Sequence, residues 1–216
     1  MTIKKGLFVV LDGGEGSGKT TLLKKAAEYY ADKAVFTREP GGSAYAEEIR
    51  NLILYSSNAK QADAKAMFGL FWAARADHLK NTIIPALNSG KIVISDRFDS
   101  STFAYQIVAQ GARELEKLFW IVREDFLGEY KPDAYIYLDL DPRIGLTRKN
   151  SQADEKKNHF DERKLEFHED LRKGYKEFLT NENRGIVGRI INAEKSKEEV
   201  WENFKKIIDS QIKKMR

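Results

Sequence analysis

One stretch near the start of the chain combines glycines, a lysine and hydroxyl groups at a spacing that suits phosphate chemistry. Residues 12–21 read DGGEGSGKTT and fit the pattern G-x-x-x-x-G-K-[ST]. Glycines reach positive φ, so successive backbone N–H groups can turn inward, and the next helix adds its positive N-terminal end. Lys19 would reach the β- and γ-phosphates, and the Thr20 hydroxyl would bind Mg²⁺. We expect this P-loop to bind the ATP phosphates through Gly13, Gly14, Glu15, Gly16, Ser17, Gly18, Lys19, Thr20 and Thr21.

Two further arginines follow predicted strands. Arg38-Glu39 comes after an apolar run at 34–37, and Asp96-Arg97 ends a second run at 91–95. Open α/β sheets bind ligands at the carboxyl ends of their strands, and a guanidinium grips phosphate bidentately. Asp96 at a strand tip could hold Mg²⁺, directly or through water. The sequence therefore predicts a second phosphate, bound by Arg38 and Arg97 across a cleft from Lys19.

Strand and helix patterns alternate along the whole chain and would position these groups. Strands are predicted at 7–11, 34–37, 91–95, 134–139 and 189–193. Helices are predicted at 21–30, 43–54, 62–88 with a break near Pro85, 99–110, 112–127, from Pro142, 160–179 and from Ser196. Alternation of this kind favours a parallel sheet covered on both faces. We expect one α/β domain over residues 1–216, a P-loop NTPase with a five-stranded parallel sheet flanked by helices and a mobile polar loop at 150–158.

Composition narrows the class of protein. The 216 residues carry a net charge of +4, which suits a phosphorylated ligand but is too small to imply a nucleic-acid partner. There is no cysteine and there are only three histidines, so disulfides, thiolate chemistry and a histidine-rich metal site are not expected. No stretch is long enough to span a bilayer, and the first apolar run is too short for a signal peptide. A soluble, cytoplasmic protein with no membrane partner is expected.

Several segments together resemble a known family. They are the P-loop, T-R-E-P-G-G at 37–42, F-W-A-A-R at 71–75, and D-R-F-D-S-S-T-F-A-Y-Q at 96–106. In this order they are similar to bacterial thymidylate kinases, which make dTDP from dTMP with ATP as the phosphate donor and Mg²⁺ as the cofactor. Pro132-Asp133, Asp139 and I-N-A at 191–193 also fit, so the resemblance covers essentially the whole chain. It implies a homodimer that binds ATP and dTMP.

The resemblance assigns roles at the phosphate and the sugar. Arg38 and Arg97 would hold the dTMP phosphate, and Glu15 would lie near the 3′-hydroxyl. The acceptor is a phosphate oxygen that is already ionised at neutral pH, so no general base is required. Catalysis would consist of positioning and charge neutralisation, with Lys19 and Arg97 as contributors.

The resemblance also assigns the side chains that recognise the base. Phe71 would stack on thymine, and Arg75, four residues on and so on the same helix face, would donate to O4. This donor favours a carbonyl over the amino group of cytosine. Ser101, Thr102 and Gln106 would read the rest of the base, and Tyr105 would crowd C2′ and disfavour ribose.

The chain departs from the family pattern in two places. Positions 14–17 carry no arginine, so a lid at about 148–163 would supply the catalytic cation. Arg148 is favoured, together with Arg163 or Lys157, and His159 stands where the family usually has the lid arginine. At 106–111 the chain reads Q-I-V-A-Q-G where the family usually has Q-G-x-x-R-G.

Other functions are weaker. Another P-loop nucleotide kinase or a deoxynucleoside kinase is the main alternative, but a nucleoside has no phosphate for Arg38 and Arg97 to bind. A regulatory GTPase would need N-K-x-D and a D-x-x-G after the metal-side strand, and neither is present. The lysines near the C-terminus, which could suggest nucleic-acid binding, fit the solvated side of a helix better.

Overall fold

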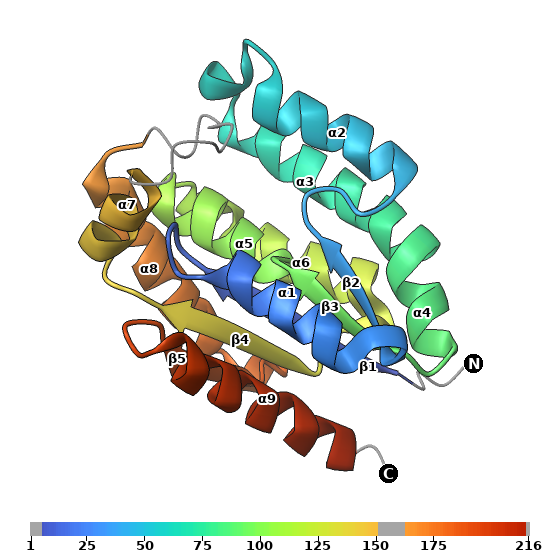
Figure 1. The fold of residues 1–216 in the computed structure, drawn as a ribbon. Helices are drawn as coiled ribbons and strands as arrows, with labels where there is room; N and C mark the ends of the chain where they lie inside the picture. Colours follow the sequence, from blue (N-terminus) through green and yellow to red (C-terminus); the bar gives the residue numbers. More distant parts are fainter. Residues whose placement is uncertain (1–5, 151–162, 215–216) are drawn as a thin grey trace.

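A five-stranded parallel sheet forms the centre of the protein (Figure 1). The computed structural model describes residues 6–150 and 163–214. The strands are β1 Leu7–Gly13, β2 Ala34–Arg38, β3 Ile92–Asp96, β4 Ala134–Asp139 and β5 Gly188–Asn192. Their order across the sheet is β2-β3-β1-β4-β5, and every neighbouring pair is parallel. The predicted α/β class and five parallel strands are confirmed, and all carboxyl ends meet at one edge.

The central strands are buried on both faces, as a fully covered parallel sheet requires. Successive side chains alternate between the faces. In β1, Phe8 and Val10 join one apolar core, whereas Leu7, Val9 and Leu11 join the other. The strand at 7–11 can therefore be apolar at every position, because water reaches neither face of the sheet there.

Helices cover both faces of the sheet (Figure 1). α1 (Lys19–Tyr30) and α9 (Lys197–Lys214) pack on the face of Leu7, Val9 and Leu11. The opposite core is built from α3 (Ala64–His78), α4 (Ile84–Asn88), the Phe103–Ala109 segment, α6 (Glu116–Leu127) and α8 (Leu165–Leu179). α2 (Ala44–Tyr55) packs on α3, α5 spans Asp99–Thr102, and α7 spans Pro142–Asn150.

One helix prediction is confirmed in outline and another needs correction. The break predicted near Pro85 is present: α3 is followed by Leu79–Ile83, which take π-helical hydrogen bonding, and α4 begins at Ile84. Proline has no N–H to donate to the preceding turn, so a change of hydrogen-bond pattern at this point is expected. The helix predicted at 160–179 begins only at Leu165, since residues 163 and 164 are not helical and 160–162 lie outside the described residues.

Serines stand at the start of α2 and of α9, but their side chains make different contacts. Ser196 forms a capping box at α9, where its Oγ accepts from the Glu199 N–H (3.2 Å) and Glu199 Oε2 accepts from the Ser196 N–H (3.1 Å). Ser43 occupies the N-cap position of α2, but its hydroxyl donates to Asp77 Oδ2 (2.6 Å). Ser43 therefore ties α2 to α3 and does not cap its own helix.

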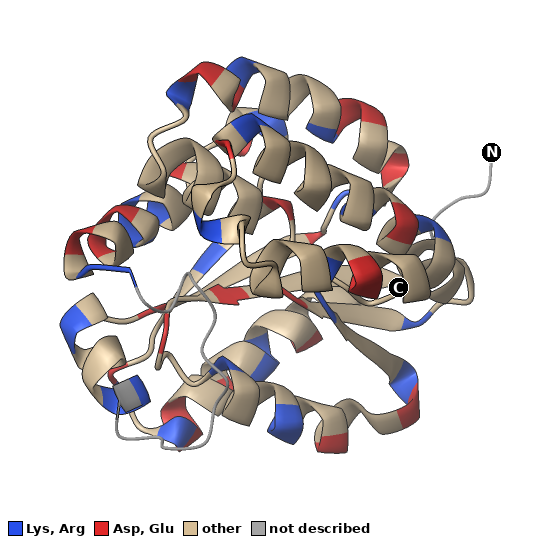
Figure 2. Ribbon diagram, turned by 90° about the horizontal axis from the view of Figure 1, so that it is seen from above, with Lys and Arg blue, Asp and Glu red and all other residues tan. Residues whose placement is uncertain are grey.

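The outer surface carries mixed charge. In the view of Figure 2, basic and acidic residues are interspersed along the outer helices. Across residues 6–150 and 163–214, no helix is both long and apolar enough to cross a membrane.

α8 approaches the Phe103–Ala109 segment very closely at one glycine. A Cβ built on Gly174 would lie 2.9 Å from both Ala104 Cα and Val108 Cβ. Backbone atoms cannot give way as a flexible side chain can, so this contact needs glycine. The contact fixes the position of α8, and of the residues next to Gly174, relative to the Phe103–Ala109 segment.

We expect Gly174→Ala to lower the free energy of unfolding by about 1 to 3 kcal/mol, because the added methyl group overpacks the contact. The matched control is Gly69→Ala in α3, where nothing lies within 4 Å of an added Cβ. That change should raise stability by up to about 1 kcal/mol, through helix propensity alone. Urea unfolding of both variants measures the difference, and equal stabilities would contradict the packing argument.

Candidate functional site

The P-loop connects β1 to α1 and shapes a cavity of about 590 Å³. Gly16 and Gly18 have φ of 66° and 90°, which turns the loop around the cavity. The predicted residues Gly14 to Thr21 all line it. Gly13 does not: its carbonyl accepts a hydrogen bond from Lys19 Nζ (3.1 Å). We call this space the donor cavity.

Basic side chains surround the rest of the donor cavity. Lys25, Arg148, Lys149, Lys195 and Lys197 line it together with Ala193, Val200 and Trp201. Burial, and after it the nearby charge of Arg97, lowers the pKa of Lys19. A cavity of this charge favours a polyanion, since each phosphate relieves repulsion between the cations.

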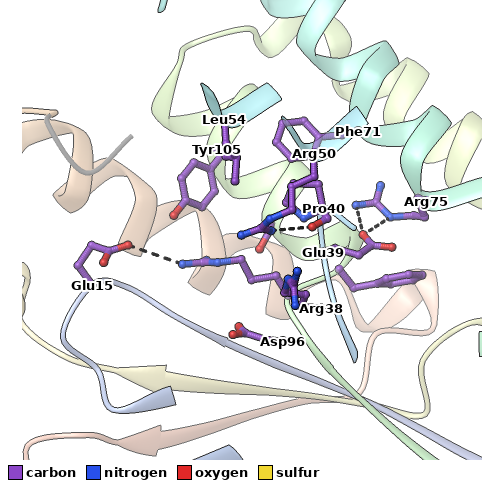
Figure 3. A pocket seen from close by; sticks show the side chains of 13 residues that line it. Glu15, Arg38, Glu39, Pro40, Arg50, Leu54, Phe71, Arg75, Asp96 and Tyr105 are labelled. Carbon is purple, nitrogen blue, oxygen red and sulfur yellow. Dashed lines mark hydrogen bonds and ion pairs between the residues drawn. The ribbon is translucent and has the colours of Figure 1, made fainter. Parts of the chain in front are cut away.

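A second pocket, of about 150 Å³, lies at the carboxyl ends of β2 and β3 (Figure 3). Its lining residues are Glu15, Arg38, Glu39, Pro40, Arg50, Leu54, Phe71, Arg75, Asp96, Arg97, Phe98, Ser101 and Tyr105. In Figure 3, Leu54, Phe71 and Tyr105 lie on one side and Asp96 on the other. This acceptor pocket thus combines apolar walls with a cluster of charge, as a site for a flat ring bearing an anion would.

Arg97 is held in place from several directions. Its backbone takes a left-handed φ of 69°, and its N–H donates to the Leu11 carbonyl (3.0 Å). In its side chain, NH1 donates to the Tyr175 hydroxyl (2.6 Å), NH2 lies 3.9 Å from Glu15 Oε1, and the guanidinium carbon lies 5.3 Å from the Tyr105 ring centre. Few orientations are left open to this cation.

Arg38 lines the same pocket but is less constrained. Its NH2 donates to both carboxylate oxygens of Glu47 (3.0 Å each), and its side chain is 55% exposed. Arg38 and Arg97 are therefore brought to one pocket, as the sequence predicted. Arg97 is preorganised, whereas Arg38 can exchange its exposed ion pair for a ligand at little cost.

Glu15 lies between the two spaces and lines both. Its Oε2 pairs with Lys149 Nζ (2.6 Å), while Oε1 faces Arg97. Burial opposes ionisation, but Lys19, Arg97 and Lys149 together lower the pKa of Glu15 to about 2. Glu15 is therefore a carboxylate at neutral pH. It contacts one cation of the donor cavity, Lys149, and one of the acceptor pocket, Arg97.

A buried network orients Arg75. Its Nε donates to Glu39 Oε2 (2.9 Å), and its NH2 donates to Thr102 Oγ1 (3.0 Å). His78 Nδ1 lies 3.1 Å from Glu39 Oε1, and its Nε2 lies 2.6 Å from Thr37 Oγ1. Arg75 NH1 is buried and has no hydrogen-bond partner among the described residues. One donor of a fixed guanidinium is thus left for a ligand, because a buried unpaired N–H is costly.

The remaining predicted base-reading residues divide into two groups. Ser101 lines the acceptor pocket, and its hydroxyl donates to Asp12 Oδ1 (3.1 Å). Thr102 and Gln106 do not line the pocket: Thr102 supports Arg75, and Gln106 is fully buried. Neither amide atom of Gln106 has a hydrogen-bond partner in the described part of the chain.

The two predicted metal ligands line different spaces. Thr20 lines the donor cavity, whereas Asp96 lines the acceptor pocket. Asp96 Oδ1 is buried with no hydrogen-bond partner in residues 6–150 and 163–214. That same part of the chain holds no cluster of three or more acidic or histidine side chains placed to bind a metal ion.

The sequence offers six cations for the lid, and the structure places three of them, Arg148, Lys149 and Arg163; the others are Lys156, Lys157 and His159. Arg148 lines the donor cavity, and its NH1 lies 3.4 Å from the Gly16 carbonyl and 3.3 Å from the Ala193 carbonyl. Arg163 lines neither space; its guanidinium carbon lies 5.6 Å from the Phe167 ring centre. The predicted loop at 150–158 falls outside the described residues, except for its first residue. The same is true of Lys156, Lys157 and His159.

Sequence reasoning missed several residues of the site. Arg50 lines the acceptor pocket, and its NH1 donates to the Pro40 carbonyl (2.6 Å). The Tyr175 hydroxyl accepts a hydrogen bond from Arg97, and Lys149, one of the lid cations in the sequence, pairs with Glu15, a contact that was not predicted. Glu39, in the T-R-E-P-G-G segment, anchors Arg75, and the sequence does not predict this contact. No pattern along the chain marks these contacts, because they depend on how the chain folds: Arg97 and Tyr175 are 78 positions apart, and Glu15 and Lys149 are 134 apart.

Comparisons with known proteins agree with this geometry. A family model for thymidylate kinase matches residues 11–204. The thymidylate kinase of Onion yellows phytoplasma is 41% identical over 213 residues, which are 97% of this chain and 98% of that protein. The thymidylate kinase of Bacillus cereus (strain ATCC 14579) is 38% identical, over 96% of this chain and 99% of that one.

The chain belongs to the thymidylate kinase family. Members of this family phosphorylate dTMP to dTDP, so the protein is a phosphotransferase. The crystal structure of thymidylate kinase from Ehrlichia chaffeensis superimposes with a TM-score of 0.72 at 27% identity, over 94% of this chain and 98% of that one. The fold and the family are therefore shown, and the alternative of another nucleotide or deoxynucleoside kinase is not favoured.

Asp12, just before the P-loop, is buried and accepts hydrogen bonds from Ser100 (2.5 Å) and Ser101. Burial raises its pKa to about 6, although Ser100, Arg97 and Ser101 act against the rise. The folded state thus holds the proton more tightly than the unfolded chain, whose aspartate titrates near its ordinary value of 3.8. The ionised group therefore costs stability as the pH rises between these two values.

We expect the stability of the wild type relative to Asp12→Asn to fall by about 2 kcal/mol between about pH 4 and pH 7, because the asparagine does not titrate. Urea unfolding of both proteins at several pH values measures this difference. A difference that stays constant with pH would contradict a raised pKa at Asp12.

Proposed function

We propose that the protein transfers the γ-phosphoryl group of ATP to the phosphate of dTMP. The observation that carries the proposal is the meeting of two anion-binding spaces at Glu15. Lys19 and the P-loop amides line one space, and Arg38 and Arg97 line the other. An enzyme that joins two phosphates needs two polyanions side by side, with their repulsion neutralised by fixed cations.

The charges define the mechanism. The attacking phosphate oxygen of dTMP is ionised at neutral pH, so no side chain has to remove a proton. Arg97, already oriented by Tyr175 and Glu15, would hold the acceptor phosphate in line with the donor. Lys19 would neutralise charge on the donor phosphates as it develops, and Arg148 at the edge of the donor cavity is placed to add to it.

Mg²⁺ fits the donor cavity as a partner of ATP. The Thr20 hydroxyl lines the cavity and is the P-loop ligand expected for this ion. The buried, unpaired Asp96 Oδ1 is a further oxygen acceptor, in the pocket that Glu15 also lines. It would suit a hydrogen bond from a water molecule bound to Mg²⁺. When bound, Mg²⁺ would neutralise negative charge on the ATP phosphates.

The acceptor pocket also suits the thymine base. Arg75 NH1 is a fixed, unpaired donor, and a ring carbonyl such as thymine O4 would satisfy it. The exocyclic amino group of cytosine is itself a donor and would leave both groups unpaired. Phe71 and Tyr105 line the walls of the pocket, where they would contact the base and the sugar.

We also propose that the protein is a homodimer, which the family resemblance supports, and that it is cytoplasmic. A third proposal is that Arg148 is the lid cation, which its place at the donor cavity supports.

The experiment that tests the function is a coupled ADP-release assay with ATP, Mg²⁺ and a panel of acceptors: dTMP, dUMP, dCMP, AMP and thymidine. The highest kcat/KM is expected with dTMP, and none above background with thymidine, which has no acceptor phosphate for Arg38 and Arg97. Lys19→Met serves as the inactive control. A wild-type protein that leaves dTMP unphosphorylated, or prefers thymidine, would refute the proposal.

We expect Arg75→Lys to lower kcat/KM for dTMP about tenfold and to narrow the preference for dTMP over dCMP. One ammonium cannot both pair with Glu39 and present a second donor to the base. Arg123→Lys is the matched control, since Arg123 is also buried and paired with a carboxylate, Asp99 (2.6 Å), outside both spaces. If both variants keep the wild-type preference, Arg75 does not select the base.

A further inference from the structure

Tyr175, on α8, joins the acceptor pocket to the start of the P-loop. Its hydroxyl accepts a hydrogen bond from Arg97 NH1 (2.6 Å) and lies 2.7 Å from Ser101 Oγ. Ser101 in turn donates to Asp12 Oδ1 (3.1 Å). Two side chains, Tyr175 and Ser101, thus connect Arg97, after β3, to the Asp12 carboxylate near the end of β1.

The donors along this chain of contacts can point in only one direction. Arg97 can only donate, and the Asp12 carboxylate can only accept. The Tyr175 hydroxyl therefore accepts from Arg97 and donates to Ser101, and Ser101 donates to Asp12. Because each hydroxyl uses its single proton, each bond polarises the next. Removing the Tyr175 hydroxyl would leave Arg97 NH1 without its acceptor.

The position of Tyr175 is set by packing on either side. Its ring stacks on Tyr137 of β4, with ring centres 4.9 Å apart and an interplanar angle of 26°. The preceding residue, Gly174, has no side chain and so allows α8 to pack closely against Ala104 and Val108. The side chain is only 1% exposed. The hydroxyl is therefore presented to Arg97 by a rigid support.

We propose that Tyr175 is a positioning residue that orients the Arg97 guanidinium toward the acceptor phosphate and, through Ser101, keeps it in register with the P-loop. The proposal rests on the proposed dTMP kinase function. It assigns a role in phosphate alignment to a core tyrosine of a helix distant in sequence from both loops. Misalignment of an oriented cation by about 1 Å can reduce the rate as much as 100-fold.

The test compares Tyr175→Phe with the wild type. Phenylalanine keeps the ring stacking and removes only the hydroxyl. We expect kcat for dTMP to fall about tenfold or more, with KM for ATP within about twofold of the wild type. By calorimetry, dTMP binding should weaken about tenfold while thymidine binding stays within about twofold, because only the phosphate contacts Arg97.

The matched control is Tyr30→Phe. Tyr30 is also a buried tyrosine, and its hydroxyl donates to a carboxylate, Asp209 (3.2 Å), away from both spaces. A variant that merely loses a buried hydrogen bond should resemble Tyr30→Phe, with a lower melting temperature and unchanged kcat and ligand affinities. Tyr175→Phe with wild-type kcat and an unchanged ratio of dTMP to thymidine affinity would overturn the proposal.

Two other outcomes remain decisive. If Tyr175→Phe does not fold, Ser101→Ala tests the next contact; the ratio of dTMP to thymidine affinity should fall at least threefold, and an unchanged ratio would overturn the proposal. A wild type that is inactive on dTMP refutes the kinase function itself. In that case the ratio of dTMP to thymidine affinity, compared between Tyr175→Phe and the wild type, still decides whether Tyr175 orients Arg97.

Discussion

The structure depends on holding many positive charges at one edge of a parallel sheet. Strand ends and loop termini bring Lys19, Arg97, Arg148 and Lys149 to the same region, where they would repel one another. Glu15 offsets this repulsion by facing both Lys149 and Arg97. A carboxylate of the protein itself thus holds cations of both spaces in place, and the phosphates of the proposed substrates would offset the remaining positive charge.

Buried carboxylates fix the directions of the arginines. Glu39 anchors Arg75, Asp99 anchors Arg123, and Asp12 ends the chain of hydrogen bonds from Arg97. A guanidinium has five donors in a rigid plane, so two fixed contacts determine where the others point. In Arg75 this leaves NH1 unpaired at the pocket. In the proposed function, anchored arginines act at both ends of the pocket: Arg75 would face the base and Arg97 the phosphate.

The fold supplies what these networks require. The two cores bury the central strands on both faces, which makes the strand ends rigid. α8 contributes through Gly174, whose missing side chain allows close approach to Ala104, and through Tyr175, which follows it. The close packing of α8 thus sets the position of the Tyr175 hydroxyl, because this hydroxyl cannot shift unless the helix shifts with it.

Local patterns in the sequence determined the elements and the chemistry. Hydrophobic runs marked all five strands, and G-x-x-x-x-G-K-T marked the donor site, because both depend on residues adjacent in the chain. Tertiary structure alone decided that Thr102 supports Arg75 and that Ser43 binds Asp77. It also decided that Tyr175 belongs to the site and that Lys149 pairs with Glu15. Such contacts join residues as much as 134 positions apart, and a one-dimensional pattern carries no information about which distant side chains packing will bring together.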